Sequence, residues 1–109
     1  MTEQNDAPQN FDLVVIGGGP GGYATAPYGA SAGLDVALVE KDKVGGTCLH
    51  RGCIPAKELL ETAAIVRTVK HAGDFGVVVE PKSVDWGVTL ARKQAVIDKL
   101  ACGVVGLLK

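Results

Sequence analysis

The chain has 109 residues and a formal net charge of −1, and 47% of its residues are hydrophobic. This composition is that of an ordinary globular domain. It has no long lysine and arginine run of the kind that binds nucleic acid, and no apolar run near the ~18 residues that a membrane span needs. The polar residues 1–10 lack the layout of a secretion signal, so we expect a disordered lead-in and a cytoplasmic, bacterial setting.

The first half of the chain predicts a β-α-β unit. Phe11–Ile16 is an apolar run that ends in glycines, which is typical of a buried strand. A glycine-rich turn, Gly17–Gly22, follows, and the alanine-rich segment Tyr23–Ala32 predicts a helix packed closely on a sheet. Asp35–Glu40 predicts a second strand, and Asp42 is expected to cap the turn after it. Together these elements indicate an α/β fold.

The predicted first helix contains two residues that disfavour a helix, Pro27 and Gly29. An interior proline costs about 3 kcal/mol, and a glycine costs up to ~1 kcal/mol relative to alanine. We therefore expect this helix to be kinked or short.

The second half predicts two helices joined by a short piece of other structure. Val44–Pro55 is a second glycine-rich stretch, and a helix is expected from Lys57 to about His71. Phe75–Val79 predicts a short strand or extended piece. Apolar residues at helical spacing predict a long helix from Trp86 to the end, with Asp85 as its N-cap.

Three structural expectations concern side chains of the last helix. Trp86 is expected to start the helix and pack against the core. Cys102, which lies among small residues, is expected to be a buried and inert thiol. The cations Arg92, Lys93 and Lys99 are expected to form a solvated face.

The turn Gly17–Gly22 has the sequence G-G-G-P-G-G and fits the pattern G-x-G-x-x-G. A strand precedes it, a predicted helix follows, and Glu40 ends the next strand 18 residues after the last glycine, which is the context of a dinucleotide site. Gly17 would allow the tight turn, Gly19 the approach of backbone to a pyrophosphate, and Gly22 close helix–strand packing. The helix N-terminus would attract the phosphates, and Glu40 could accept hydrogen bonds from ribose hydroxyls. A bare tight turn is the alternative, and the pattern does not distinguish FAD from NAD.

Cys48 and Cys53 are separated by four residues. A regular helix would hold their Cα atoms about 8.6 Å apart, and a disulfide needs less than about 7 Å, so a bond would require a loop or a distorted helix. A bridge across so short a loop adds little stability through chain entropy, which favours a redox role. A helix beginning just after Cys53 would also lower the pKa of the Cys53 thiol.

Two unconnected thiols are the main alternative to a redox disulfide. A metal site with His50 is less favoured, because C-x4-C is not usual zinc spacing, and no metal ligand is predicted.

The segment Gly45–Lys57, G-G-T-C-L-H-R-G-C-I-P-A-K, resembles the redox-active segment of the pyridine nucleotide–disulfide oxidoreductases of class I. The resemblance runs from Phe11 to Lys109 and is strongest to the members that oxidise protein-bound dihydrolipoamide. It implies an incomplete Rossmann-like FAD-binding domain over residues 11–109, in which the β-α-β unit is followed by a redox-active helix and a long C-terminal helix. It also implies that the NAD-binding and dimerisation domains lie beyond this chain.

The resemblance also implies the chemistry of the site. Cys48 would be the thiol that exchanges with lipoamide, and Cys53 the thiol nearest the flavin, with NAD+ as the final electron acceptor. The partners implied are the lipoyl domain of a 2-oxoacid dehydrogenase complex or of the glycine cleavage system, and a second copy in a homodimer. The residues implied to bind FAD are Gly17, Gly19, Pro20, Gly22, Glu40, Lys41, Gly46, Thr47, Cys53 and Lys57.

Three other interpretations are kept. The chain could be a non-catalytic segment, because a sheet of two strands leaves much edge and apolar surface uncovered. It could belong to another member of the family, such as a glutathione- or mercuric-reductase-like enzyme. A small thiol or metal-binding module is the third interpretation.

Overall fold

The structure, a computed structural model, describes residues 8–80 and 83–109. Within these ranges it contains two strands, four α-helices and one 3-10 helix, so the predicted α/β class is confirmed. The expected disordered lead-in, residues 1–10, lies mostly outside the described residues.

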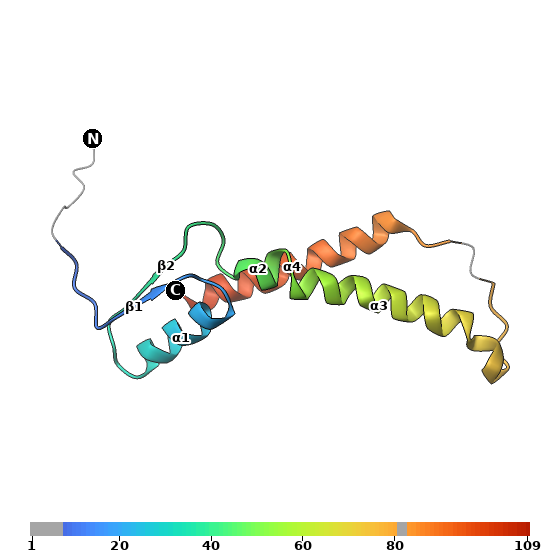
Figure 1. Cartoon of the computed structure of the whole chain (residues 1–109), viewed down its shortest axis with the longest axis horizontal. Coiled ribbons are helices and arrows are strands. Elements are labelled where there is room, and N and C mark those ends of the chain that lie inside the picture. The colour runs from blue at the N-terminus through green and yellow to red at the C-terminus, as the bar shows by residue number, and fades with distance from the viewer. Residues whose placement is uncertain (1–7, 81–82) are drawn as a thin grey trace.

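A β-α-β unit occupies the N-terminal part of the molecule (Figure 1). It consists of β1 (Leu13–Ile16), α1 (Pro20–Ser31) and β2 (Val36–Val39). The two strands are parallel and pair residue for residue over their full length, and α1 packs against both. The predicted strands are therefore confirmed, although each is two residues shorter than predicted.

The first helix is longer than predicted. It starts at Pro20, inside the expected turn, and continues through Pro27 to Ser31, so the expectation of a short helix is wrong. Its packing explains why it continues: Ala26 and Gly29 are buried, and a Cβ atom at Gly29 would come within 3.1 Å of Leu13 and 3.2 Å of Val36. Gly29 thus allows the helix to lie close to both strands, and this packing outweighs its poor helix propensity.

Two consecutive helices hold the segment between the cysteines. They are α2 (Gly46–His50) and α3 (Cys53–Lys70), and they are separated by a break at Arg51 and Gly52. The helix expected from Lys57 therefore begins one turn earlier. Pro55 does not prevent this start, because the first-turn residues of a helix have no intrahelical partner for their N–H groups.

The chain then turns and returns along α3. A 3-10 helix, η1 (Ala72–Phe75), ends at Gly76, whose φ is +74°. Residues 77–80 form no strand, so of the two expectations for Phe75–Val79 the strand is wrong. Helix α4 (Trp86–Leu107) packs against α3 and α2, and the side chain of Asp85 accepts a hydrogen bond from the Val88 N–H at 3.0 Å, which confirms the predicted N-cap.

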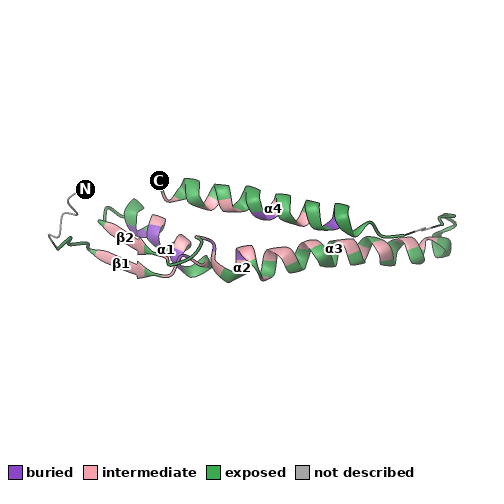
Figure 2. Cartoon of the chain, turned by 90° about the horizontal axis from the view of Figure 1, so that it is seen from above, coloured by how far each residue is buried: buried purple, intermediate pink, exposed green. Residues whose placement is uncertain are grey.

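The molecule is elongated and has a small core. It measures 70 × 36 × 17 Å, with a radius of gyration of 21.1 Å. Among the residues that the structure describes, the buried side chains are those of Ala26, Leu49, Ile97 and Thr89. In Figure 2 the buried and half-buried parts of α3 and α4 face each other, and their outer sides are exposed.

Two side-chain expectations for α4 are wrong. Trp86 starts the helix as predicted, but its side chain is 61% exposed and does not pack in the core. Cys102 is exposed rather than buried. Cys102 instead lines an open pocket that it shares with Val44 and His50, and amino-acid type alone does not report such exposure.

Candidate functional site

The glycine-rich turn joins β1 directly to α1. Gly17 has a φ of +102°, a conformation that favours glycine, and its N–H donates to the Val39 carbonyl at 2.8 Å. A Cβ atom at Gly22 would overlap the carbonyl oxygen of Gly17. These two glycines therefore provide the tight turn and the close helix–strand packing that the sequence pattern predicts.

The N-terminus of α1 is suited to an anion. Gly19 is the N-cap, no side chain caps the helix, and Pro20 occupies its first turn. A Cβ atom at Gly19 or at Gly21 would meet nothing within 4 Å, so the backbone here faces open space. Free first-turn N–H groups at a positive helix terminus are the groups that bind a pyrophosphate, and these residues fit the dinucleotide that the sequence implies.

Glu40 follows β2 and turns back onto the glycine turn. Its Oε1 accepts from the Asp42 N–H at 2.9 Å, and its Oε2 accepts from the Gly18 N–H at 2.7 Å. The bond from Asp42, and after it the bond from Gly18, hold the pKa of Glu40 below its ordinary value. Glu40 is therefore an ionised acceptor, and a carboxylate retains further lone pairs for ribose hydroxyls.

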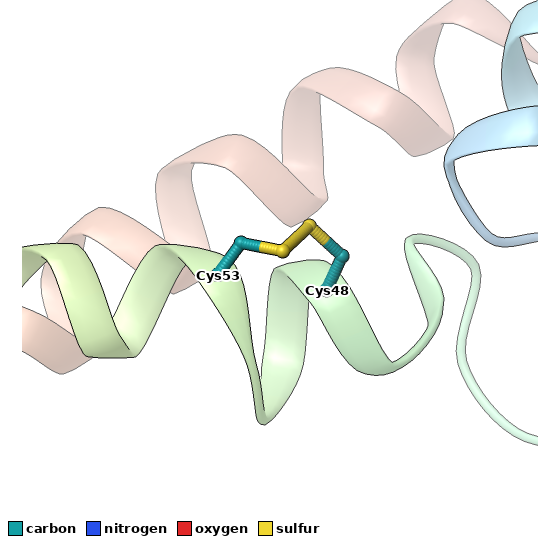
Figure 3. Close-up of a disulfide and its surroundings, with 2 residues drawn as sticks. All are labelled: Cys48 and Cys53. Carbon is teal, nitrogen blue, oxygen red and sulfur yellow. A yellow bond between two sulfur atoms is a disulfide. The ribbon is translucent and has the colours of Figure 1, made fainter.

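Cys48 and Cys53 form a disulfide across the break between α2 and α3 (Figure 3). Their Cα atoms are 4.7 Å apart, little more than half the separation that a regular helix would impose. The expected distortion is thus present, at Arg51 and Gly52. Cys48 is half-buried and Cys53 is exposed at the first residue of α3.

The structure brings the two glycine-rich motifs together. The Gly45 N–H donates to the Gly18 carbonyl at 2.7 Å. Gly46 has a φ of +61°, and a Cβ atom there would lie 2.8 Å from the Cα of Gly19. The start of α2, which carries Cys48, therefore packs directly on the turn that begins α1, and any side chain at position 46 would separate them.

The remaining predicted cofactor residues lie on three neighbouring segments of the chain. Lys41 directly follows Glu40 and is exposed, and Thr47 is exposed in the first turn of α2. Lys57 is exposed on α3 one turn after Cys53, so the two residues lie on the same side of that helix.

Two contacts at the break were not predicted. The Nε2 atom of His50 lies 2.8 Å from the Val44 carbonyl oxygen. Arg51 forms an ion pair with Asp42 at 2.8 Å, so the side chain of Asp42 binds Arg51 instead of capping the turn. Both partners lie in the connection between β2 and α2, and sequence spacing gives no signal for such pairs.

Another ion pair lies between the two long helices. Arg92, expected on a solvated face, pairs with Glu58 of α3 at 3.3 Å. Within residues 8–80 and 83–109, no three histidine, cysteine, aspartate or glutamate side chains gather as a metal site would require. In the same ranges, no helix has the length and apolar character needed to cross a membrane.

Comparison with known proteins gives consistent results. Residues 11–109 match the family described as pyridine nucleotide-disulphide oxidoreductase. Curated relatives include dihydrolipoyl dehydrogenases of Bacillus subtilis (strain 168) and Chlamydia trachomatis, which are 52% and 48% identical over 99 residues. Each of these alignments covers 91% of this chain and 21% of the relative, so the chain spans about a fifth of the length of those relatives.

A solved structure also resembles the chain. It is a Cu(II) complex of the HOCl-induced flavoprotein disulfide reductase RclA from Escherichia coli, with a TM-score of 0.68 and 31% identity. The match covers 89% of this chain and 19% of that one. The predicted similarity to the dihydrolipoamide-oxidising members and to a partial flavoprotein fold is thus confirmed.

Proposed function

Because this chain belongs to the pyridine nucleotide–disulphide oxidoreductases, we propose that it is the FAD-binding, disulfide-bearing segment of a dihydrolipoyl dehydrogenase. The observation that carries the proposal is the Cys48–Cys53 disulfide at the α2–α3 break, on a helix that packs against the glycine turn. Residues 11–109 would form part of the FAD-binding domain of a longer enzyme. The NAD-binding and dimerisation domains would be supplied by the rest of that enzyme.

The cofactor proposed for the glycine turn is FAD. The α1 N-terminus would hold the pyrophosphate, with Glu40 as the acceptor for the adenosine ribose. When bound, FAD supplies a two-electron acceptor that passes the electrons on to NAD+. The residues proposed to contact it are Gly17, Gly19, Pro20, Gly22, Glu40, Lys41, Gly46, Thr47, Cys53 and Lys57.

The cysteines would perform the thiol chemistry. One thiolate of dihydrolipoamide attacks the Cys48 sulfur, which forms a mixed disulfide and releases Cys53 as a thiolate. The second substrate thiolate then attacks the substrate sulfur of that mixed disulfide, so that lipoamide leaves and Cys48 is also reduced. The two substrate thiolates lose two electrons as their disulfide forms, and the cysteine pair gains these electrons as the Cys48–Cys53 bond breaks and both cysteines become thiolates. Cys53 is the first residue of α3, and the N-terminus of a helix favours a negative charge, so Cys53 is well placed to leave as a thiolate.

The proposed partners follow from the proposed reaction. The substrate would be lipoamide on the lipoyl domain of a 2-oxoacid dehydrogenase complex or of the glycine cleavage system, and the complete enzyme would be a homodimer. The proposed setting is a bacterial cytoplasm. The name dihydrolipoyl dehydrogenase supports the proposed lipoamide substrate, and the organisms of these relatives support a bacterial source.

The test is a visible absorption spectrum of the chain after gel filtration with added FAD, before and after addition of dihydrolipoamide. We expect a retained flavin band that dihydrolipoamide bleaches. In Cys53→Ser the band should be retained but not bleached, because that variant lacks the disulfide.

The other results of this experiment separate the alternatives. A band that glutathione bleaches faster than dihydrolipoamide would favour a glutathione-reductase-like enzyme. A chain that retains no flavin would count against the proposal and favour a non-catalytic segment.

A further inference from the structure

The two basic residues between the cysteines both bind the connection that precedes α2. The His50 Nε2 lies 2.8 Å from the Val44 carbonyl oxygen, and an Nη2 proton of Arg51 is donated to Asp42 over 2.8 Å. Both contacts join the break between α2 and α3 to residues 42–44. No role proposed above uses them.

The disulfide depends on a bend that a regular helix would remove. The Cα atoms of Cys48 and Cys53 lie 4.7 Å apart, compared with about 8.6 Å in a regular helix. Once the disulfide is reduced, no covalent bond keeps the chain bent at Arg51 and Gly52. The noncovalent contacts at the bend then decide how often the two thiols meet, that is, their effective concentration.

The His50 contact holds one side of this bend. The imidazole is half-buried, and a Cβ atom at Gly45 would lie 3.1 Å from its Nε2. The ring therefore lies closely against Gly45, which also donates its N–H to the Gly18 carbonyl. This contact connects the end of α2 to the backbone that packs on the glycine turn.

Arg51 pairs with Asp42, whose backbone is itself fixed by a hydrogen bond. The Asp42 N–H donates to Glu40 Oε1 at 2.9 Å, and Glu40 Oε2 accepts from the Gly18 N–H at 2.7 Å. Arg51 is thus linked through Asp42 and Glu40 to the same glycine turn. The bend has two anchors, one through a partly buried hydrogen bond and one through an exposed ion pair.

We infer that His50 and Arg51 are positioning residues for thiol–disulfide exchange at Cys48 and Cys53. They keep the reduced pair bent, so the two thiols stay close and the disulfide re-forms more readily. The inference rests on the proposed redox role of the pair, but its test requires neither FAD nor lipoamide.

The test measures the disulfide equilibrium of the whole chain in mixtures of reduced and oxidised dithiothreitol. Reduced dithiothreitol converts the protein disulfide to two thiols and becomes a cyclic disulfide, so two electrons and two protons move between the pairs. Free thiols are trapped with a maleimide and counted by mass. A Cys102→Ser background removes the exposed third cysteine.

The expected shifts are towards the dithiol. Arg51→Gln and Asp42→Asn should each lower the equilibrium constant for disulfide formation by up to about fivefold, the upper range for an exposed ion pair. His50→Phe should lower it by about two- to tenfold, the range for one hydrogen bond. The double variant Arg51→Gln/Asp42→Asn should shift no further than either single variant, because both remove the same contact.

Arg92→Gln is the matched control. Its side chain is 64% exposed, as is that of Arg51, and it also forms an interelement ion pair, but away from the bend. The disulfide equilibrium of this variant should equal that of the unchanged protein. In 1 M NaCl the disulfide equilibrium constant of the unchanged protein should approach that of Arg51→Gln, because the Debye length falls to about 3 Å and the ion pair is screened. This salt comparison tests the inference even if the His50→Phe variant does not fold.

Two results would overturn the inference while the proposed function stands. One is an equilibrium constant in Arg51→Gln and His50→Phe equal to that of the unchanged protein. The other is a double variant Arg51→Gln/Asp42→Asn whose shift in the logarithm of the equilibrium constant equals the sum of the two single-variant shifts. Conversely, a chain that retains no flavin but shows the expected shifts would contradict the proposed function and support the positioning role.

Discussion

At the scale of single residues, two adjacent glycines of the dinucleotide turn should respond oppositely to the same substitution. A Cβ atom at Gly22 would overlap the Gly17 carbonyl oxygen, whereas one at Gly21 meets nothing within 4 Å. Gly22→Ala should therefore lower the free energy of unfolding by about 1–3 kcal/mol, the usual cost of overpacking. Gly21→Ala should raise it by up to about 1 kcal/mol, because alanine favours a helix. Urea unfolding of both variants checks this, and equal effects would contradict the turn geometry.

Glu40 predicts a dependence of stability on pH. Hydrogen bonds from the N–H groups of Asp42 and then of Gly18 lower its pKa from the ordinary value of 4.5. A carboxyl group whose pKa is lower in the folded state contributes stability above the unfolded pKa and loses it as pH falls through the folded pKa. The contribution of Glu40 should thus be complete above about pH 5 and disappear below its folded pKa.

The measurement is urea unfolding of Glu40→Gln and of the unchanged protein between pH 3 and pH 7. Glu40→Gln should be the less stable at pH 7, and the difference should shrink as pH falls below 4.5. Glu61→Gln, on the exposed side of α3, is the control and should show no such change. A difference that grows towards low pH would have the wrong sign for this explanation.

At the scale of elements, α1 contains two prolines in different positions. Pro20 lies in the first turn, where its missing N–H costs nothing, and Pro27 lies inside the helix. An alanine at position 27 could donate its N–H to the Tyr23 carbonyl, so Pro27→Ala should raise the free energy of unfolding by up to about 3 kcal/mol. Pro20→Ala should leave it nearly unchanged. Thermal unfolding of the two variants measures this difference. If Pro27→Ala melts at or below the melting temperature of Pro20→Ala, the packing of the Pro27 ring outweighs the cost of its missing hydrogen bond.

Elements governed by local rules could be predicted from the sequence. Both strands, the glycine turn and the Asp85 N-cap depend on residues near one another in the chain, and all three are confirmed. The expectation that α1 would be short was wrong, because the length of this helix depends on contacts of Gly29 with two strands. Local propensity contains no information about such contacts.

The candidate site divides in the same way. A spacing of five positions predicts that a Cys48–Cys53 disulfide requires a distorted helix, whereas the disulfide itself was implied by the family resemblance, and both are present. The contact of Arg51 with Asp42, nine positions away, could not, because it depends on how the connection after β2 folds back. The exposure of Cys102 depends on what covers α4, which no pattern within α4 specifies.

At the scale of the whole molecule, the exposed apolar surface is large for the size of the core. Many large hydrophobic side chains are exposed, among them Ile16 at 88%, Phe75 at 85% and Val78 at 94%. An apolar cavity of about 620 Å³ lies near the far end of the α3–α4 pair, beside Phe75 and Val77. Surface of this kind is usually covered by other protein, in agreement with a segment that spans about a fifth of its relatives.

The shape gives a direct test of whether the isolated chain keeps this arrangement. Its radius of gyration is 21.1 Å, whereas a compact chain of this length would have about 13 Å and an unfolded chain about 33 Å. We expect small-angle X-ray scattering, extrapolated to zero concentration, to give a value near 21 Å if the β-α-β unit and the α3–α4 pair stay assembled without covering protein. A value near 13 Å would mean that the exposed apolar residues collapse onto one another. A value near 33 Å would mean that the four side chains buried within residues 8–80 and 83–109 are too few to hold the fold, because burial of apolar area is the main source of folding stability.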